Sequence, residues 1–286
     1  MRYSRTGIVV VLLAAELFIG AAIIWCLDGR FSVQAAGLHA VDAHGKTLAP
    51  IDAGDAPHVV IDDPDSRVVI TASTDGKVHV TDDSRTWGWV WGTPTVPPLT
   101  AARTADGVSI RRANGNLHVG ILGIDFQHTE VAVPPAAFLD ITRCGGAQVT
   151  GITGEVGIHS VDGSISLNGV HSTKITLASD DGSLRLNDVR TPNIDAVTND
   201  GSIRAAGLSV DGGRLQSSDG SIHVGLLAAN LAVHAHTDDG SIRFNGERAA
   251  QDEDSGTADY QVGTGGGSLR VSTQDGSIHI NTNGAI

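Results

Sequence analysis

Two pairs of adjacent carboxylates are the residues of this 286-residue chain best suited to acid–base chemistry: Asp180 with Asp181, and Asp238 with Asp239. Polysaccharide-degrading enzymes cluster such carboxylates, and one acts as the acid while the other acts as the base or nucleophile. Each pair overlaps an Asp-Gly turn that recurs along the sequence, whereas a catalytic site should interrupt a repeat with unique residues. No Gly-x-Ser-x-Gly elbow or zinc motif occurs either. We therefore expect a protein that is not an enzyme; the alternative is a polysaccharide-acting β-helix enzyme.

Histidine and acidic side chains provide the candidate metal ligands. His234 and His236 alternate with the apolar Val233 and Ala235, so on a strand both would face outward and could chelate a metal. No third ligand is evident, which favours a plain surface pair. An acidic insertion near 247–259 is more typical of a solvated loop than of a cation site. The recurring turns lack the Gly-Gly-x-Gly-x-Asp spacing of calcium-binding repeats. We predict no cofactor and no metal.

Three tryptophans are the candidate ligand-binding residues. Trp87, Trp89 and Trp91 lie in an insertion near 85–100 and would face one side of a strand. An exposed tryptophan stripe could stack on sugar rings or rest at a membrane interface. The alternative is a lid that seals an apolar flank of the fold.

All of these candidates are set within a tandem repeat. The tetrapeptide Asp-Gly-Ser-Ile, or Asp-Gly-Ser-Leu, occurs six times, and its glycines are separated by 19, 19, 19, 20 and 36 residues. The last interval is nearly two periods. Such constant spacing indicates a repeat architecture. The turn glycines are Gly163, Gly182, Gly201, Gly220, Gly240 and Gly276.

The residues around each turn glycine alternate between apolar and polar. Apolar residues stand two and four places after the glycine, as in Ile165 and Leu167, and five and seven places before it, as in Ile158 and Val156. This is the period-2 pattern of a half-buried strand. A unit this small cannot bury its apolar side alone, whereas coils stacked every ~4.8 Å can. We predict an all-β, single-chain β-solenoid with coils of about 19 residues.

Stacking has further consequences for this solenoid. The spacing from Gly76 to Gly276 predicts ten or eleven coils, and each corner glycine is expected to need a positive φ. Hydroxyl residues three places before the glycine should form an internal ladder: Ser160, Ser179, Thr198, Ser217, Thr237 and Thr273. The third place after it should form an outward, mostly basic column beside the turn aspartates: Ser166, Arg185, Arg204, His223, Arg243 and His279.

The N-terminus indicates export. Arg2 and Arg5 precede an apolar run of about 21 residues, enough to cross a bilayer. Residues 1–30 are predicted to be a membrane anchor or signal segment, 31–54 a linker with a possible cap, and 55–286 the solenoid. The expected location is the cell membrane, single-pass, with the C-terminal domain extracytoplasmic. Secretion after cleavage near Ala35 is the alternative. The net charge of −13 argues against nucleic acid as a partner.

The repeat also resembles a known family. The segment 131–165, which runs from Val-Ala-Val-Pro through Gly-Glu-Val-Gly-Ile into Asp-Gly-Ser-Ile, is similar to the putative-adhesin family of bacterial envelope proteins. The resemblance covers roughly residues 55–285 and implies a β-helix-like solenoid, exported or single-pass, without catalytic residues. It implies an adhesin-like binding or structural envelope module whose partner is a glycan or an envelope protein. A partner-binding component of an envelope signalling system is the alternative.

Overall fold

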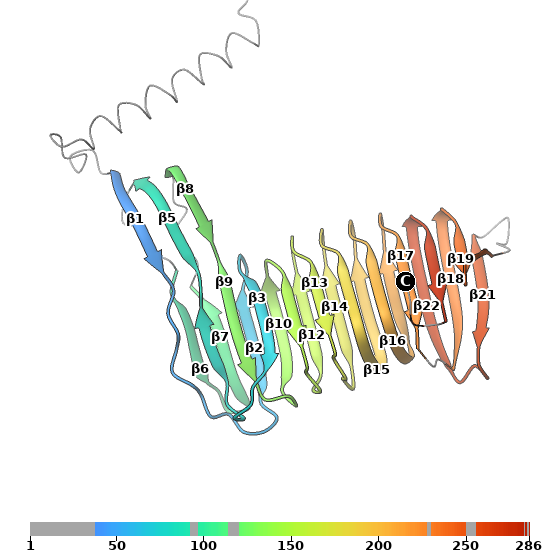
Figure 1. Cartoon of the computed structure of the whole chain (residues 1–286), viewed down its shortest axis with the longest axis horizontal. Coiled ribbons are helices and arrows are strands. Elements are labelled where there is room, and N and C mark those ends of the chain that lie inside the picture. Colours follow the sequence, from blue (N-terminus) through green and yellow to red (C-terminus); the bar gives the residue numbers. More distant parts are fainter. Residues whose placement is uncertain are drawn as a thin grey trace, which may run out of the picture. The chain divides into compact units, whose positions relative to one another are not determined.

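A computed structural model describes residues 38–91, 97–113, 120–227, 230–249, 256–282, 284 and 286 (Figure 1). These residues form strands and their connections, and none of them belongs to a helix that could span a membrane. The all-β prediction is therefore confirmed for the part of the chain that is described. The predicted anchor or signal segment, residues 1–30, lies outside it.

The chain divides into two units. The first comprises residues 1–43, 86–95 and 116–124. Its described strands form a three-stranded sheet in the order β1 (Leu38–His44), β5 (Arg85–Trp91) and β8 (Gly120–Phe126). The second unit comprises residues 44–85, 96–115 and 125–286 and contains the other strands in one continuous sheet.

The strands of the second unit are short, apart from two that continue from one coil into the next, β15 and β16. In chain order they are β2 (His58–Asp63), β3 (Arg67–Ala72), β4 (His79–Asp82), β6 (Leu99–Arg103), β7 (Gly107–Arg112), β9 (His128–Val133), β10 (Phe138–Cys144), β11 (Ala147–Thr150), β12 (Val156–Ser160), β13 (Ile165–Asn168), β14 (Ile175–Ser179), β15 (Leu184–Thr198), β16 (Ile203–Ser217), β17 (Ile222–Leu226), β18 (Leu231–Asp239), β19 (Ile242–Phe244), β20 (Glu247–Arg248), β21 (Thr257–Val262), β22 (Gly267–Asp275) and β23 (Ile278–Asn281).

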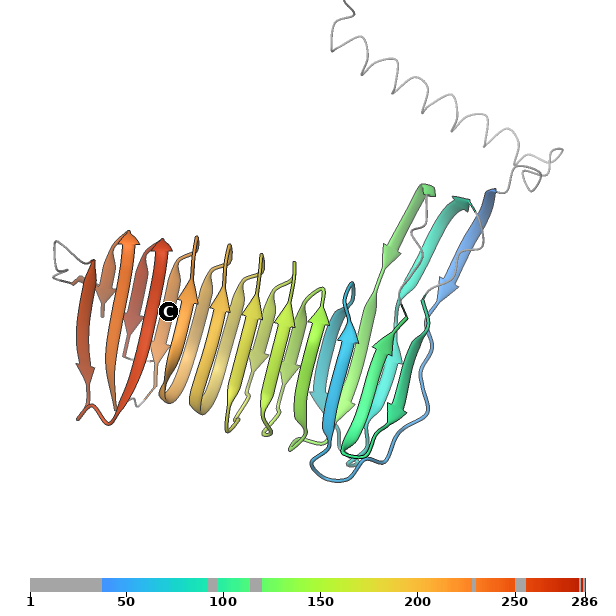
Figure 2. The ribbon, with the colours of Figure 1, turned by 180° about the vertical axis from the view of Figure 1, so that it is seen from behind.

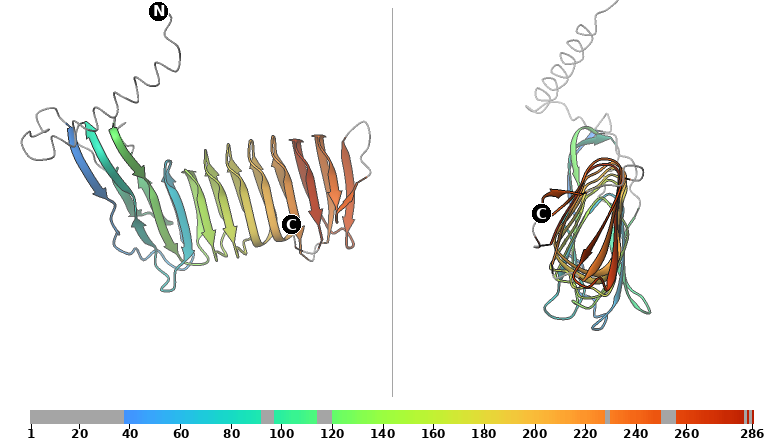
Figure 3. Two further views of the ribbon diagram at one scale, coloured as in Figure 1. Left: turned by 45° about the horizontal axis from the view of Figure 1, so that its top comes forward. Right: turned by 90° about the vertical axis from the view of Figure 1, so that its right-hand side faces the viewer.

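Equivalent strands of neighbouring coils pair in parallel, and the repeat determines their register. Ile165 of β13 lies beside Leu184 of β15, and Leu184 lies beside Ile203 of β16. Their side chains are fully buried, so each coil adds an aliphatic residue to one internal column. Complete burial of such a side chain contributes about 1.5–3 kcal/mol. Figure 2 shows the strands of the second unit from behind, and the right-hand view of Figure 3 looks along the stacked coils. The predicted repetitive, solenoid-like stacking is confirmed.

The stacking order departs from chain order at both ends of this unit. β22 pairs in parallel with β16 on one side and with β18 on the other, so the last coil in sequence lies between two earlier ones (Figure 1). At the other end, β2 pairs with β7 and with β10. The described residues form nine coils, in the spatial order β7/β9, β2/β3, β10/β11, β12/β13, β14/β15, β15/β16, β16/β17, β22/β23 and β18/β19.

The prediction of ten or eleven coils was wrong because the chain folds back at both ends. Gly76 precedes β4, which runs antiparallel to β9 and is not part of a coil. β6 runs antiparallel to β7 at the same end, and β20 and β21 run antiparallel to β19 and β18 at the other. Strands folded back in this way cover the backbone edge of a terminal coil, which would otherwise be free to pair with another chain.

The corner glycines are required for close packing between coils. None of the six has a positive φ, so that part of the prediction was wrong. A Cβ atom on Gly276 would lie 2.6 Å from the carbonyl oxygen of Gly220. At the other five corners a Cβ would also come closer than 3.0 Å to the neighbouring coil's corner carbonyl. Real Cβ atoms do not tolerate such contacts, so the backbones can stack at this distance only if the corner has no side chain.

The predicted hydroxyl ladder exists, although the hydroxyls bond to carbonyl groups and not to one another. All six hydroxyl residues are buried. Thr198 Oγ1 donates to the carbonyl oxygen of Gly182 at 2.8 Å, and Ser217 Oγ donates to that of Gly201 at 2.7 Å. Ser179 Oγ also accepts a hydrogen bond from the amide of Gly182 at 3.0 Å. Each hydroxyl therefore connects one corner to the next, satisfying polar groups that stacking removes from water.

Candidate functional site

The predicted tryptophan stripe lies on β5 of the three-stranded sheet. The backbone of Trp87, Trp89 and Trp91 is described there, whereas their side chains lie outside the described part of the structure. Both interpretations of the tryptophans, as a ligand-binding stripe and as a lid, therefore stay predictions.

The histidine pair faces outward, as its alternation with buried Val233 and Ala235 predicted. His234 Nδ1 lies 2.7 Å from Asp259 Oδ1, and His236 Nε2 lies 3.0 Å from a carboxylate oxygen of Asp238. Among the described residues, no group of three or more histidine, cysteine or acidic side chains could hold a metal ion. Each imidazole thus has one carboxylate partner.

Part of the predicted acidic loop is a strand. Asp259 lies on β21, which pairs antiparallel with β18. The sequence did contain a signal for this edge strand, because apolar and polar residues alternate from Ala258 to Val262. The prediction of a solvated loop missed it. Residues 250–255 of the insertion lie outside the described structure.

The carboxylate pairs of the enzyme alternative lie at coil corners. The amide of Asp181 donates to the carbonyl oxygen of Val161 at 3.0 Å, and the amide of Asp200 donates to that of Asp180 at 3.0 Å. These backbone bonds join the corners of successive coils. The acids therefore occupy positions that the repeat uses for stacking.

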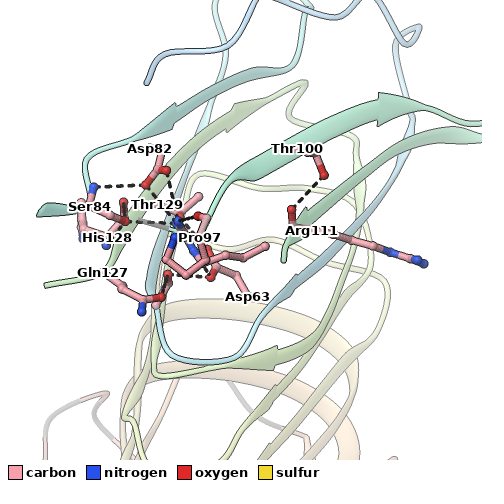
Figure 4. A network of polar contacts seen from close by, with 11 residues as sticks. Asp63, Asp82, Ser84, Pro97, Thr100, Arg111, Gln127, His128 and Thr129 are labelled. Atoms are coloured by element: carbon pink, nitrogen blue, oxygen red, sulfur yellow. Dashed lines mark hydrogen bonds and ion pairs between the residues drawn. The ribbon is translucent and has the colours of Figure 1, made fainter. Parts of the chain in front are cut away.

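A buried ion cluster at the N-terminal end of the stack was not predicted. Arg112 Nε of β7 donates to Asp63 Oδ1 of β2 at 2.7 Å, and Arg112 Nη2 donates to Asp82 Oδ1 of β4 at 3.0 Å. Arg112 Nη2 also donates to Ser84 Oγ and to Thr129 Oγ1, at 3.1 and 3.0 Å. Figure 4 shows these partners converging from separate strands. Burial opposes the charge, but hydrogen bonds from Arg112 and Ser84 hold the pKa of Asp82 below its usual value.

This cluster connects strands, and its charged groups are buried. Every guanidinium nitrogen of Arg112 has a partner, including the carbonyl oxygen of Pro97 at 3.0 Å from Nη1. The sequence did contain a signal for it. Asp63 follows the inward Val59 and Ile61 at period 2, and Arg112 follows Val108 and Ile110 in the same way. Opposite charges at inward strand positions are expected to pair.

A basic column runs along the opposite, C-terminal part of the stack. Parallel pairing aligns its members across β15, β16, β17, β23 and β19, and antiparallel β20 adds one more. We define the basic column, in spatial order, as Arg185, Arg204, His223, His279, Arg243 and Arg248. The four arginines are exposed and the two histidines are half-buried.

The two histidines at the centre of the basic column are in contact. The ring centroids of His223 and His279 lie 4.7 Å apart, with 34° between the ring planes. Burial, together with the charges of His279 and Arg204, lowers the pKa of His223 below its ordinary value. Burial first, and then the neighbouring positive charges, therefore disfavour a proton on His223.

Comparison with known proteins assigns most of this chain to one family. The family model described as Toastrack DUF4097 matches residues 62–281. The chain belongs to this Toastrack family. The match confirms the resemblance to a family of putative adhesins. No match was found among curated proteins.

Solved structures similar to this Toastrack chain come from bacteria. A putative adhesin from Bacteroides fragilis is 12% identical, with a TM-score of 0.44, covering 86% of this chain and 96% of that one. A putative adhesin from Parabacteroides distasonis is 12% identical, with a TM-score of 0.37, covering 82% and 97%. A putative cell adhesion protein from Clostridium sporogenes is 10% identical, with a TM-score of 0.32, covering 85% and 100%.

The Toastrack chain has one cysteine in its described part, Cys144, and that thiol is buried. Burial raises the pKa of Cys144, which disfavours the nucleophilic thiolate.

Proposed function

We propose that this Toastrack chain is a non-catalytic, adhesin-like binding module of the bacterial envelope. The observation that carries the proposal is the position of the acids that would have to catalyse. Asp180 and Asp181 lie at a corner where their backbone amides bond to the carbonyl oxygens of Ser160 and Val161 in the neighbouring coil, so their place follows from stacking. In contrast, the outward residues between corners vary from coil to coil and are free to serve recognition.

The proposed location is the cell membrane, with residues 1–30 as a single-pass anchor and the coils outside the cytoplasm. Its support is the apolar run after Arg2 and Arg5. Two measurements test this location. Intact cells are labelled with a membrane-impermeant biotin reagent, and the size of the mature chain is then determined. Labelling only after lysis would contradict the extracytoplasmic location. A soluble mature chain that lacks the N-terminal segment would support secretion instead.

Capture experiments test the binding function. The full chain should retain a glycan or protein from solubilised envelopes. A variant with Trp87, Trp89 and Trp91 changed to alanine tests whether the insertion near 85–100 contributes. If binding is specific, the captured material should stay bound to the chain during a wash with an unrelated acidic protein. Hydrolysis of a polysaccharide by the wild type, abolished by Asp180→Asn with Asp181→Asn while the fold persists, would overturn the non-catalytic assignment.

A further inference from the structure

We propose that the basic column binds an acidic polysaccharide chain laid along the stack of coils. The inference deepens the proposed binding function and depends on it. It rests on three features of the described residues: the spacing of the cationic groups, the lack of acidic partners for them, and the chemistry of the rows on either side.

The column is continuous and regularly spaced. Arg185 pairs with Arg204, Arg204 with His223, and His223 with His279, each on the next strand. Neighbouring strands lie about 4.8 Å apart, so the cationic groups recur at that interval along the stack. An extended polysaccharide advances by a similar distance for each sugar ring. A chain with one acidic group on each sugar, or on every second one, could therefore meet several members of the column at once.

The arginines of the column lack direct ion pairs with the described residues, although a turn aspartate stands four places before most members of the column. Within the described structure, Arg185, Arg204, Arg243 and Arg248 form no ion pair with an acid. Like charges directly opposite each other on neighbouring strands destabilise a sheet. Elsewhere in the stack opposite charges pair across strands. Arg214 Nε lies 2.8 Å from Asp195 Oδ1, and Arg143 Nε lies 2.8 Å from Asp62 Oδ1. A polyanion would relieve the repulsion within the column.

The flanking rows can hydrogen-bond to sugars. Two residues before the column members stands a row of half-buried serines: Ser183, Ser202, Ser221, Ser277 and Ser241. On the other side Asn187 extends beside Asn168, and its Nδ2 donates to Asn168 Oδ1 at 3.0 Å. Hydroxyl and amide groups match the hydroxyls of a sugar.

Single-stranded nucleic acid is the less suitable polyanion. Its binding sites use aromatic platforms on which bases stack, whereas no tryptophan, tyrosine or phenylalanine belongs to the column or to its flanking rows. The net charge of −13 also repels a polyanion from the remainder of the surface, so attraction is restricted to the column. The occupant that fits both charge and hydroxyl groups is an acidic polysaccharide.

The test uses the full chain and three polymers: polygalacturonate, neutral dextran and polyphosphate. The column variant combines Arg185→Ser, Arg204→Ser and Arg243→Ser, because serine occupies the equivalent position, Ser166, of a neighbouring coil. The control variant combines Arg103→Ser, Arg111→Ser and Arg270→Ser, exposed arginines outside the column, and changes the net charge equally.

Titration calorimetry at low salt should show that polygalacturonate binds and dextran does not. The column variant should lose at least about tenfold in affinity, the control variant less than about twofold, and added salt should weaken binding. An equal loss in both variants, or tighter binding of polyphosphate than of polygalacturonate, would overturn the inference. If no acidic polymer binds but the chain still captures an envelope component, only this inference fails. If it captures none, the proposed function fails as well.

Discussion

Thr273 Oγ1 donates a hydrogen bond of 2.9 Å to the carbonyl oxygen of Gly220, although 53 residues separate the two in sequence. Thr237 Oγ1 donates in the same way to the carbonyl oxygen of Gly276, at 2.8 Å. The corner of Gly276 therefore lies between those of Gly220 and Gly240. The last coil in sequence, β22/β23, is therefore enclosed on both sides. The outermost coil is β18/β19, and β21 covers the edge of its strand β18.

This order can be tested by disulfide formation. Gln216 lies beside Ser272, and Ser272 lies beside His236. In a background with Cys26→Ser, mild oxidation should join Gln216→Cys to Ser272→Cys, because Cα atoms of neighbouring strands lie about 5 Å apart. Gln216→Cys with His236→Cys should not join, since two strand spacings, about 10 Å, exceed the reach of a disulfide. Stacking in chain order would produce the opposite pair of results, read by electrophoresis without reductant.

The fold was largely predictable because every coil repeats one environment. The inward aliphatics and corner glycines recur with the turn, so a single period describes them all. The order of the last coils was not predictable for the same reason. Thr273 with Gly276 presents the same corner as Thr237 with Gly240, and either could stack on Gly220. Antiparallel strands at the ends, which lack the repeat, decide which coil is outermost.

The candidate sites also differ in how far the sequence alone predicts them. The outward direction of the basic column followed from alternation, whereas its order and the contact between His223 and His279 required the three-dimensional pairing. The cluster of Arg112 depends on Asp82, which lies on an antiparallel strand outside the repeat. Such contacts between non-equivalent strands have no periodic signal.

The hydroxyl ladder should contribute measurably to stability. Thr273→Val keeps the shape of the side chain but leaves the buried carbonyl of Gly220 without this donor. We expect the free energy of unfolding in urea to fall by about 1–3 kcal/mol. Thr176→Val, on the exposed side of β14, should change it by less than about 0.5 kcal/mol. Equal effects of the two substitutions would contradict a specific role for the ladder.

The corner glycines should not tolerate alanine. In Gly201→Ala the Cβ would meet the carbonyl of Gly182 and lie 2.7 Å from Thr198 Oγ1, so the coils must separate. We expect a loss of about 1–3 kcal/mol in the free energy of unfolding. Gly157→Ala on β12 is the matched control, because the nearest atom, the carbonyl oxygen of Leu139, would lie at 3.6 Å. That variant should be neutral or slightly more stable; a comparable loss would argue against the packing explanation.

The cluster around Arg112 should dominate the stability of the N-terminal coils. Arg112→Met leaves Asp63 and Asp82 buried without a cation, and we expect a loss of about 3–5 kcal/mol. The surface pair of Arg143 and Asp62 provides the comparison, and Arg143→Met should cost less than about 1 kcal/mol. Urea unfolding at neutral pH measures both. Similar losses in Arg112→Met and Arg143→Met would show that burial of the cluster does not increase its contribution to stability.

The same cluster should be sensitive to acid. The pKa of Asp82 is lowered in the folded chain, so its contribution to stability is present above the unfolded pKa and is lost as pH falls through the folded one. We expect Asp82→Asn to be less stable than wild type at neutral pH and the difference to shrink below about pH 4. A difference that persists unchanged at pH 3 would mean that charge is not its origin.

The histidine contact of the basic column should make stability depend on pH in the opposite direction from a histidine that is paired with a carboxylate. Burial first, and then the charges of His279 and Arg204, lower the pKa of folded His223. The unfolded chain thus binds the proton more readily, and the free energy of unfolding should fall as pH drops through about 6.5. His223→Gln removes the titrating group and should flatten this decline between pH 7.5 and about 5.5. His159→Gln, an exposed histidine on β12, is the matched control, and thermal melting at each pH measures the slopes. An unchanged slope in His223→Gln would refute the assignment of this pH dependence to His223.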